Sequence, residues 1–201
     1  MTRTARTYLL TALSTLLLSF PGTLRGQDGM PQGWYAQLDA LSLTTGFPGV
    51  TAGWTGQKGW MPEVSAGATW LLVRTRPACA EHVTLQASLN KILPIQGHPE
   101  MAWTAGAGAA AGYYDFGEDE RGSQGQYAGL TAGLSWMRSI AEHTWIRIGA
   151  SVLAGYASDN PYKVSEADGR LLWQSRRESF FVAPAAVKMS ITYYFKTGQQ
   201  K

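Results

Sequence analysis

The sequence predicts an all-β fold, an eight-stranded antiparallel transmembrane β-barrel preceded by a cleaved signal peptide. The first observation is that residues 181–195 alternate between an apolar face and a small or polar face, which is the period of a strand between lipid and a polar lumen. The second is a secretory signal at the N-terminus. The third is abundant Gly, Trp and Tyr without any run of helix-spanning length. The apolar face of 181–195 consists of Phe181, Ala183, Ala185, Val187, Met189, Ile191, Tyr193 and Phe195.

The N-terminal segment reads as a signal peptide over residues 1–26. Arg3 and Arg6 form a basic region, residues 9–20 are apolar, and residues 21–26 form a short cleavage region. The apolar stretch is shorter than the ~20 residues that cross a bilayer, so an N-terminal anchor helix is the weaker alternative. No cysteine lies near the cut, which argues against lipoprotein processing. The barrel is predicted over 27–195, with a tail at 196–201.

Removing the signal changes the charge balance. The chain has 17 basic and 14 acidic residues, and three of the basic ones, Arg3, Arg6 and Arg25, lie before residue 27. The mature chain is therefore formally neutral, and its sequence predicts no nucleic-acid partner. Cys79 is the single cysteine, so neither an intrachain disulfide nor a cysteine-based zinc cluster is possible.

Four strands are predicted in the N-terminal half of the barrel, separated by turns at 47–48 and 55–59 and by a loop at 74–80. In the fourth strand, Val83, Leu85, Ala87 and Leu89 share one face. The prolines at 94 and 99 break regular structure after it. The predicted strands are 34–43, 49–54, 61–73 and 82–92.

The C-terminal half supplies the other four strands, at 101–114, 124–138, 144–156 and 181–195. A tight turn is predicted at 141–143, whereas 115–123 and 157–178 are charged and are predicted to be loops. Short turns at one end and longer loops at the other are typical of outer-membrane barrels. We expect the first and last strands to close the barrel, with outer-membrane lipid and the barrel-assembly machinery as partners.

Residues 111–195 resemble an uncharacterised domain-of-unknown-function family of small outer-membrane β-barrel proteins from fimbriated gut and oral anaerobes. The resemblance implies a barrel in the outer membrane, sometimes encoded near fimbrial assembly genes, and no known activity. The matching motifs are Gly112-Tyr113-Tyr114-Asp115, Gln124-Gly125-Gln126-Tyr127, Gly133-Leu134-Ser135, Ile148-Gly149-Ala150, Gly155-Tyr156 and the closing strand from Pro184 to Tyr194.

No motif predicts an enzyme or a cofactor. The glycines of residues 106–112 have neither dinucleotide-fingerprint nor P-loop spacing and fit a strand with small side chains facing a narrow lumen. His82, His98 and His143 are scattered, so they predict no metal site. The alternative is a lipid-modifying outer-membrane enzyme, which would need His82 beside a serine such as Ser65 and an acid such as Glu63.

Four charged residues are predicted to face the lumen. Arg147 and Lys188 interrupt the alternation of their strands at inward positions, and Asp39 and Glu63 share that interior. Buried charges must be paired to be tolerated, and side chains fill the lumen of an eight-stranded barrel. We therefore expect these residues to plug the barrel. A small pore is the alternative.

The region 157–178 carries a candidate interaction surface, for which a plain solvated loop is the alternative. Together these observations predict a non-enzymatic barrel with a structural or interaction role, in fimbria and surface-structure assembly or in envelope assembly. The residues of the surface are Tyr162, Lys163, Arg170, Trp173, Arg176 and Arg177.

Overall fold

The computed structural model describes residues 30–40, 48–69, 78–118, 120–165 and 170–195. The signal peptide, the C-terminal tail and the far ends of two predicted strands, 41–43 and 70–73, lie outside these residues. Nine strands of the described part form one antiparallel sheet. They are β1 (Gly33–Asp39), β2 (Gly49–Thr55), β3 (Trp60–Ala68), β4 (Ala78–Ile95), β5 (His98–Glu118), β6 (Arg121–Ala141), β7 (Thr144–Val164), β8 (Leu171–Trp173) and β9 (Arg177–Tyr194).

Eight of these strands close into a barrel, as the sequence predicted. The order is β6-β5-β4-β3-β2-β1-β9-β7, and β7 pairs back with β6. The first and last strands meet, with Tyr35 opposite Tyr194 and Asp39 opposite Ser190. The short β8 adds to β7 beyond the end of β9, where Trp173 pairs with Tyr162. We call the end with the tight turns at 56–59, 96–97 and 142–143 the turn end, and the opposite end the loop end.

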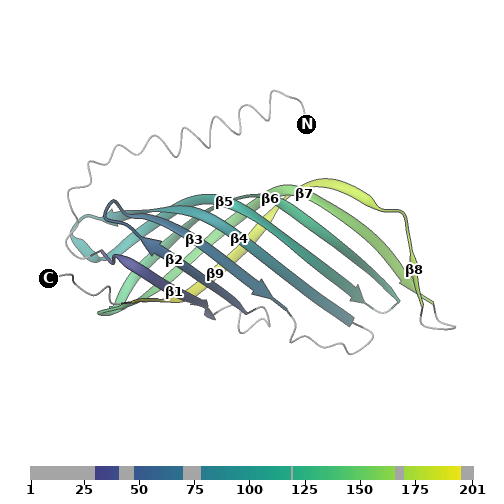
Figure 1. Cartoon of the computed structure of the whole chain (residues 1–201), viewed down its shortest axis with the longest axis horizontal. Helices are drawn as coiled ribbons and strands as arrows, with labels where there is room; N and C mark the ends of the chain where they lie inside the picture. Colours follow the sequence, from purple (N-terminus) through teal and green to yellow (C-terminus); the bar gives the residue numbers. More distant parts are fainter. Residues whose placement is uncertain (1–29, 41–47, 70–77, 119, 166–169, 196–201) are drawn as a thin grey trace, which may run out of the picture.

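The wall of the barrel has very unequal height (Figure 1). β1 and β2 have 7 residues each, whereas β5, β6 and β7 have 21 each. The predicted loops at 115–123 and 157–178 were therefore largely wrong. The ladder continues to Glu118 opposite Arg121 and to Asp159 opposite Arg177, and β7 runs to Val164. A strand ladder in water can carry polar residues on both faces, so its composition is that of a loop.

The break predicted around residues 94–99 is a tight turn. β4 continues to Ile95 and β5 starts at His98, so the prolines lie inside strand ends. Gly97 has a φ of 78° in this turn, a backbone conformation that glycine adopts without strain.

The closing strand does not keep one face throughout its length. Ser151 of β7 pairs with Ala186 and Val152 pairs with Pro184, so the register shifts by one residue at Ala185. The prediction that Phe181 and Ala183 belong to the lipid face was therefore wrong. The Phe181 ring meets the Tyr127 ring in the lumen at 6.3 Å, while Val182 points outward with 66% exposure. The bulge was invisible in the sequence because both faces are apolar there.

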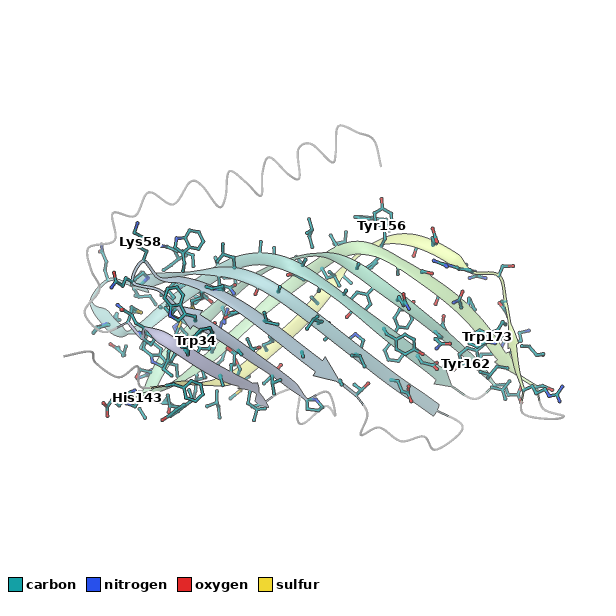
Figure 2. The ribbon with its side chains drawn as sticks, in the orientation of Figure 1. Trp34, Lys58, His143, Tyr156, Tyr162 and Trp173 are labelled. Atoms are coloured by element: carbon teal, nitrogen blue, oxygen red, sulfur yellow. The ribbon has the colours of Figure 1, made fainter. Side chains whose placement is uncertain are left out.

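The outer face carries an apolar band between two sets of aromatic side chains. Tyr156 and Phe180 contact each other at the loop-end border of the band, with ring centroids 5.4 Å apart. From Ile146 to Tyr156, β7 has the ~10-residue length with which a tilted strand crosses a hydrocarbon core. Figure 2 shows Trp34 and Tyr156 at its two borders. The exposed turn-end aromatics are Trp34, Trp54, Trp60, Trp103, Tyr193 and Phe195. Within the described residues there is no helix long and apolar enough to span a bilayer.

Candidate functional site: the lumen and the projecting sheet

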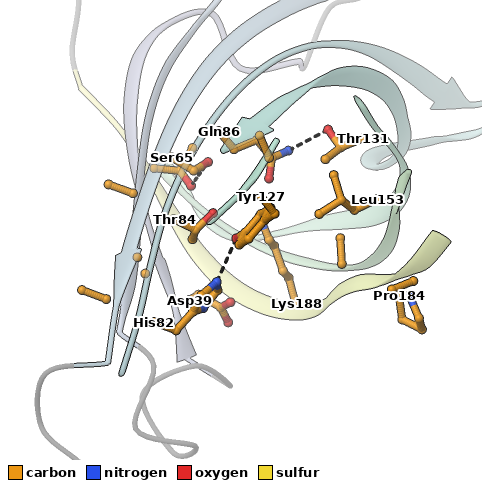
Figure 3. A pocket seen from close by; sticks show the side chains of 18 of the residues that line it. Asp39, Ser65, His82, Thr84, Gln86, Tyr127, Thr131, Leu153, Pro184 and Lys188 are labelled. Carbon is orange, nitrogen blue, oxygen red and sulfur yellow. Dashed lines mark hydrogen bonds between the residues drawn. The ribbon is translucent and has the colours of Figure 1, made fainter. Parts of the chain in front are cut away.

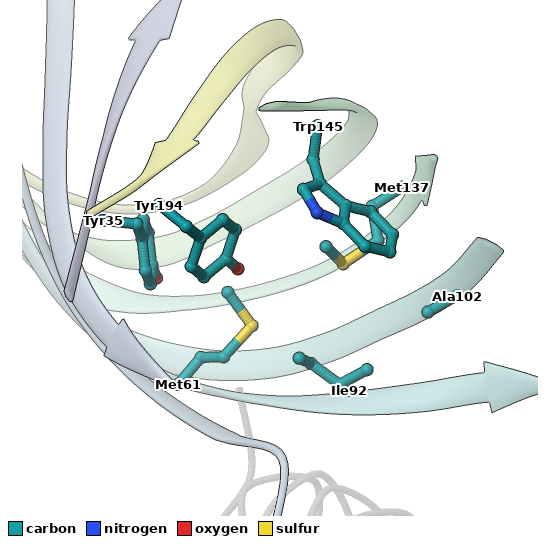
Figure 4. Close-up of a cluster of buried hydrophobic side chains, with 7 residues drawn as sticks. All are labelled: Tyr35, Met61, Ile92, Ala102, Met137, Trp145 and Tyr194. Carbon is teal, nitrogen blue, oxygen red and sulfur yellow. The ribbon is translucent and has the colours of Figure 1, made fainter. Parts of the chain in front are cut away.

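Hydrophobic side chains fill the turn end of the lumen (Figure 4). They come from β1, β3, β4, β5, β6, β7 and β9, so seven of the eight barrel strands contribute to one cluster. Because these side chains are almost wholly buried, the cluster closes the lumen at this end. Its members are Tyr35, Met61, Ile92, Ala102, Met137, Trp145 and Tyr194.

A buried carboxylate holds the next layer together. Glu63 of β3 forms an ion pair and a hydrogen bond with Arg147 of β7, across the lumen. The Tyr35 hydroxyl donates to Glu63 Oε1 at 2.7 Å, and Asn90 Nδ2 donates to Oε2 at 2.7 Å. The side chains of Arg147 and Glu63 are only 11% and 7% exposed. The structure thus brings together two of the four predicted lumen charges and adds two neutral donors that satisfy the carboxylate.

A glycine makes the contact between Tyr35 and Glu63 possible. Gly53 of β2 lies between them in the sheet, opposite Tyr35 on one side and opposite Glu63 on the other. The phenol ring passes over Gly53, where an added Cβ would overlap the ring.

The same crossing of a tyrosine over a glycine occurs three more times. Tyr127 crosses Gly112, Tyr114 crosses Gly125 and Tyr162 crosses Gly122. The three hydroxyl partners are His82 Nε2 at 2.8 Å, Asp159 Oδ1 at 3.1 Å and Asp115 Oδ1 at 2.8 Å.

Replacing Gly53 by Ala should destabilise the barrel by about 1–3 kcal/mol, because the displaced Tyr35 hydroxyl would leave a buried carboxylate oxygen without this donor. The measurement is urea unfolding in lipid vesicles. Ala52→Gly, next to it on the outward face, is the matched control and should cost less than 1 kcal/mol. In a Tyr35→Ala background, Gly53→Ala should cost much less than it does in the parent, because the ring that the added Cβ would overlap is then absent.

Lys188 and Asp39 lie nearer the loop end than Glu63 and Arg147. Both line a cavity of about 630 Å³ in the lumen. The ammonium group of Lys188 interacts electrostatically with the carboxylates of Glu63 and Asp39 and with the Arg147 guanidinium. Within the described residues it makes no hydrogen bond or ion pair. Figure 3 shows Lys188 extending into the lumen beside Tyr127 and His82.

The arrangement required for a hydrolase site does not form around His82. Its Nε2 pairs with the Tyr127 hydroxyl at 2.8 Å, and their rings stack at 5.7 Å. The Ser65 hydroxyl pairs with Thr51 at 2.9 Å, and Glu63 is engaged with Arg147. Serine, histidine and acid are therefore each held by a different neighbour. Among the described residues, no three His, Cys, Asp or Glu side chains lie together as metal ligands.

The strands β5, β6 and β7, with β8 at their tip, continue past the apolar band as a projecting sheet. On its outer face Tyr162 lies across Gly122, and the Trp173 ring packs on it edge-on at 5.4 Å. Lys163 is exposed on β7, and Arg177 pairs with Asp159 in the ladder. Arg170 is exposed just before β8, and Arg176 forms an exposed ion pair with Glu178 at 3.1 Å. Tyr162, Lys163, Trp173 and Arg177 thus lie on strands of the projecting sheet. Arg170 and Arg176 lie in the connections on either side of β8. Figure 2 shows Tyr162 and Trp173 at the tip.

Several contributors to these sites were missed from the sequence. Asn90, Tyr35 and Gly53 were given no role, and Asp159 was placed only in the charged region that was predicted to be a loop. A tyrosine on an inward position is visible in a sequence, but the glycine that it crosses lies on another strand. Finding the pair requires the register between the strands, which one sequence does not supply.

Comparisons with protein-family models and with curated proteins gave no match. The resemblance to the fimbria-associated barrel family therefore has no family match behind it. Among solved structures, the chain is similar to the crystal structure of Neisserial surface protein A (NspA), with a TM-score of 0.43 and 14% identity over 83% of this chain and 99% of that one. A likeness this distant carries no argument about function. The closed eight-stranded barrel is established by the strand pairings themselves.

Proposed function

We propose that this protein is a non-conducting, non-enzymatic barrel of the outer membrane that presents its projecting sheet as a recognition surface. The observation that carries the proposal is the length of β5, β6 and β7, at 21 residues each. A strand of that length tilted by ~45° rises about 50 Å, against a hydrocarbon core of about 30 Å. We infer that the excess stands outside the membrane at the loop end.

The tip of this sheet has the composition of an interaction surface. Leu171, Leu172 and Trp173 are 42%, 57% and 53% exposed, beside the cations of Lys163 and Arg170. Exposed aromatic and arginine side chains are the residues that most often carry binding energy at interfaces. A partner surface with acidic and apolar groups would complement this tip. A role in fimbria or envelope assembly is one setting for such a partner.

The pore and the enzyme are the weaker alternatives. The hydrophobic cluster at the turn end and the Glu63–Arg147 pair both lie across any ion path through the lumen. His82, Ser65 and Glu63 are engaged with separate partners. We therefore infer a recognition role in preference to transport or catalysis.

Site-specific crosslinking in intact cells tests the recognition surface. A photoreactive residue at Leu172 should give a discrete adduct with an envelope or surface component, because this side chain is exposed at the tip. The same residue at Trp34, which is 62% exposed at the turn end, is the control. In a Cys79→Ser background, Leu172→Cys should also react with a membrane-impermeant maleimide added to whole cells. A Leu172 site that gives no adduct, or that the maleimide does not reach, contradicts the proposal.

Planar bilayer recordings test the non-conducting lumen. The purified barrel should show no single-channel steps, because the buried cluster at the turn end leaves no water-filled path. Truncating the cluster with Trp145→Ala and Met137→Ala together should introduce small conductance steps or unfold the barrel, and gel migration with and without heating distinguishes the two results. Steps in the unmodified protein whose ion selectivity changes with Arg147→Ala would favour the small pore.

A further inference from the structure

We infer that the lumenal cavity at the loop end binds one single-chain amphiphile, with its hydrocarbon chain in the lumen and its anionic head at Lys188. The inference goes beyond the proposed recognition surface and does not depend on what the projecting sheet binds. It is carried by the size and lining of the cavity, by the donors of Lys188 and by the way the cavity reaches the outer surface.

The cavity has the size of a ligand site and a wall that is part polar and part apolar. Its volume of about 630 Å³ falls within the ~300–1,000 Å³ of small-molecule pockets. The wall carries polar side chains, as is ordinary for the lumen of such a barrel, but Leu153, Phe181, Ala183 and Ala110 add an apolar part to it. Leu153 and Ala110 are each only 8% exposed. Water finds few hydrogen-bond partners beside these apolar side chains, whereas a hydrocarbon chain can pack against them.

Most polar groups of the cavity, Asp39 included, have partners within the protein, and Lys188 is coupled to the carboxylates of Asp39 and Glu63 only through space. His82 pairs with Tyr127, Thr51 pairs with Ser65, and Gln86 Nε2 donates to Thr131 at 3.3 Å (Figure 3). The Lys188 ammonium, by contrast, makes no hydrogen bond within the described residues. It has three donors and lies half-buried in the cavity wall. A carboxylate or phosphate oxygen would satisfy these donors with charge-assisted hydrogen bonds.

The cavity is continuous with the outer surface of the barrel beside β9. Its lining includes Val50 and Val187, which face outward with 58% and 65% exposure. The β1–β9 ladder stops at Asp39 opposite Ser190. From there toward the loop end, in the described part of the chain, β9 pairs only with β7. Pro184, which cannot donate to a ladder, also lies in this stretch. In the described part of the chain, the cavity therefore meets the outer surface between Val50 and Val187.

Equilibrium dialysis tests the site directly. The mature protein is held in an amphipathic polymer, so that no single-chain detergent competes, and is titrated with radiolabelled dodecanoate against polymer alone. We expect saturable binding of one dodecanoate per barrel. Lys188→Met should weaken dodecanoate binding about tenfold and leave the binding of uncharged dodecanol unchanged. Dodecanoyl lysophosphatidylglycerol in a parallel titration distinguishes a membrane lipid from a free fatty acid as the source of the chain.

Two substitutions on one strand provide a matched pair for the hydrocarbon part. Ala110→Phe places a ring in the cavity and should abolish binding, whereas Ala109→Phe on the exposed outer face should bind as the parent does. If Ala110→Phe lacks the gel migration of a folded barrel, Leu153→Asn replaces it and should weaken binding about tenfold. Absence of saturable binding of every probe, equal losses in the two phenylalanine variants, or equally tight binding of dodecyltrimethylammonium would overturn the inference.

Discussion

Glu63→Gln should cost about 3–5 kcal/mol of unfolding free energy, because it leaves the Arg147 guanidinium buried without its counter-charge. Arg147→Met should cost a similar amount, since it leaves the carboxylate of Glu63 unpaired. The double variant should be more stable than either single variant, because no uncompensated charge then stays in the lumen. Urea unfolding in lipid vesicles, followed by tryptophan fluorescence, measures all three.

The exposed pair of Arg176 and Glu178 is the matched control for this cycle. Their side chains are 63% and 70% exposed, so Arg176→Met should change the stability by no more than about 0.5 kcal/mol. Additive losses in the Glu63 and Arg147 double variant would mean that the two side chains act separately. The network around Tyr35 and Asn90 would then need a different energetic basis.

An arginine on the outer face at the middle of the apolar band should be the most costly surface substitution. Val152 is 52% exposed and lies between Ile146 and Tyr156 on β7, and Leu134 of β6 is 51% exposed two rungs away. Val152→Arg and Leu134→Arg should each cost about 2–4 kcal/mol, because the charge enters hydrocarbon. Tyr156→Arg, at the aromatic border, should cost about 0–1 kcal/mol.

The depth dependence of these arginine costs locates the membrane on the barrel. The same vesicle unfolding measurement serves, with Lys at each position as a check on side-chain length. If Val152→Arg and Tyr156→Arg cost the same small amount, the band does not face lipid. The proposed outer-membrane location would then be wrong.

The alternation of apolar residues was enough to predict the class of fold, the strand count of the barrel and its closure. Val83, Leu85 and Leu89 all face outward, and residues spaced two and four apart share one face only in a strand. The ends of the long strands could not be predicted in this way. Around Asp115 and Asp159 both faces of the strands carry polar residues. The sequence therefore has no apolar alternation there, and its composition is that of a loop.

Only part of the candidate site could be predicted from the sequence, for a related reason. The positions of Arg147 and Glu63 on inward faces follow from the pattern of each strand. Whether the two side chains meet depends on the registers of the six other strands of the barrel. The bulge at Ala185 reversed Phe181 because alanine and proline on both sides of it give no contrast between faces. The cavity at Lys188 is the space that side chains of several strands leave between them, so the pattern of no single strand predicts it.

The four tyrosines that cross glycines have a consequence for how the barrel assembles. Each hydroxyl reaches its partner only if three neighbouring strands are aligned, as Tyr35, Gly53 and Glu63 are. A slip of one residue would put Ala52 or Trp54 under the Tyr35 ring and turn the carboxylate of Glu63 away from the lumen. A misaligned barrel would therefore lose such contacts near the turn end, at Tyr35, and toward the loop end, at Tyr114 and Tyr162. The small residues under these rings therefore help to specify the register of the wall.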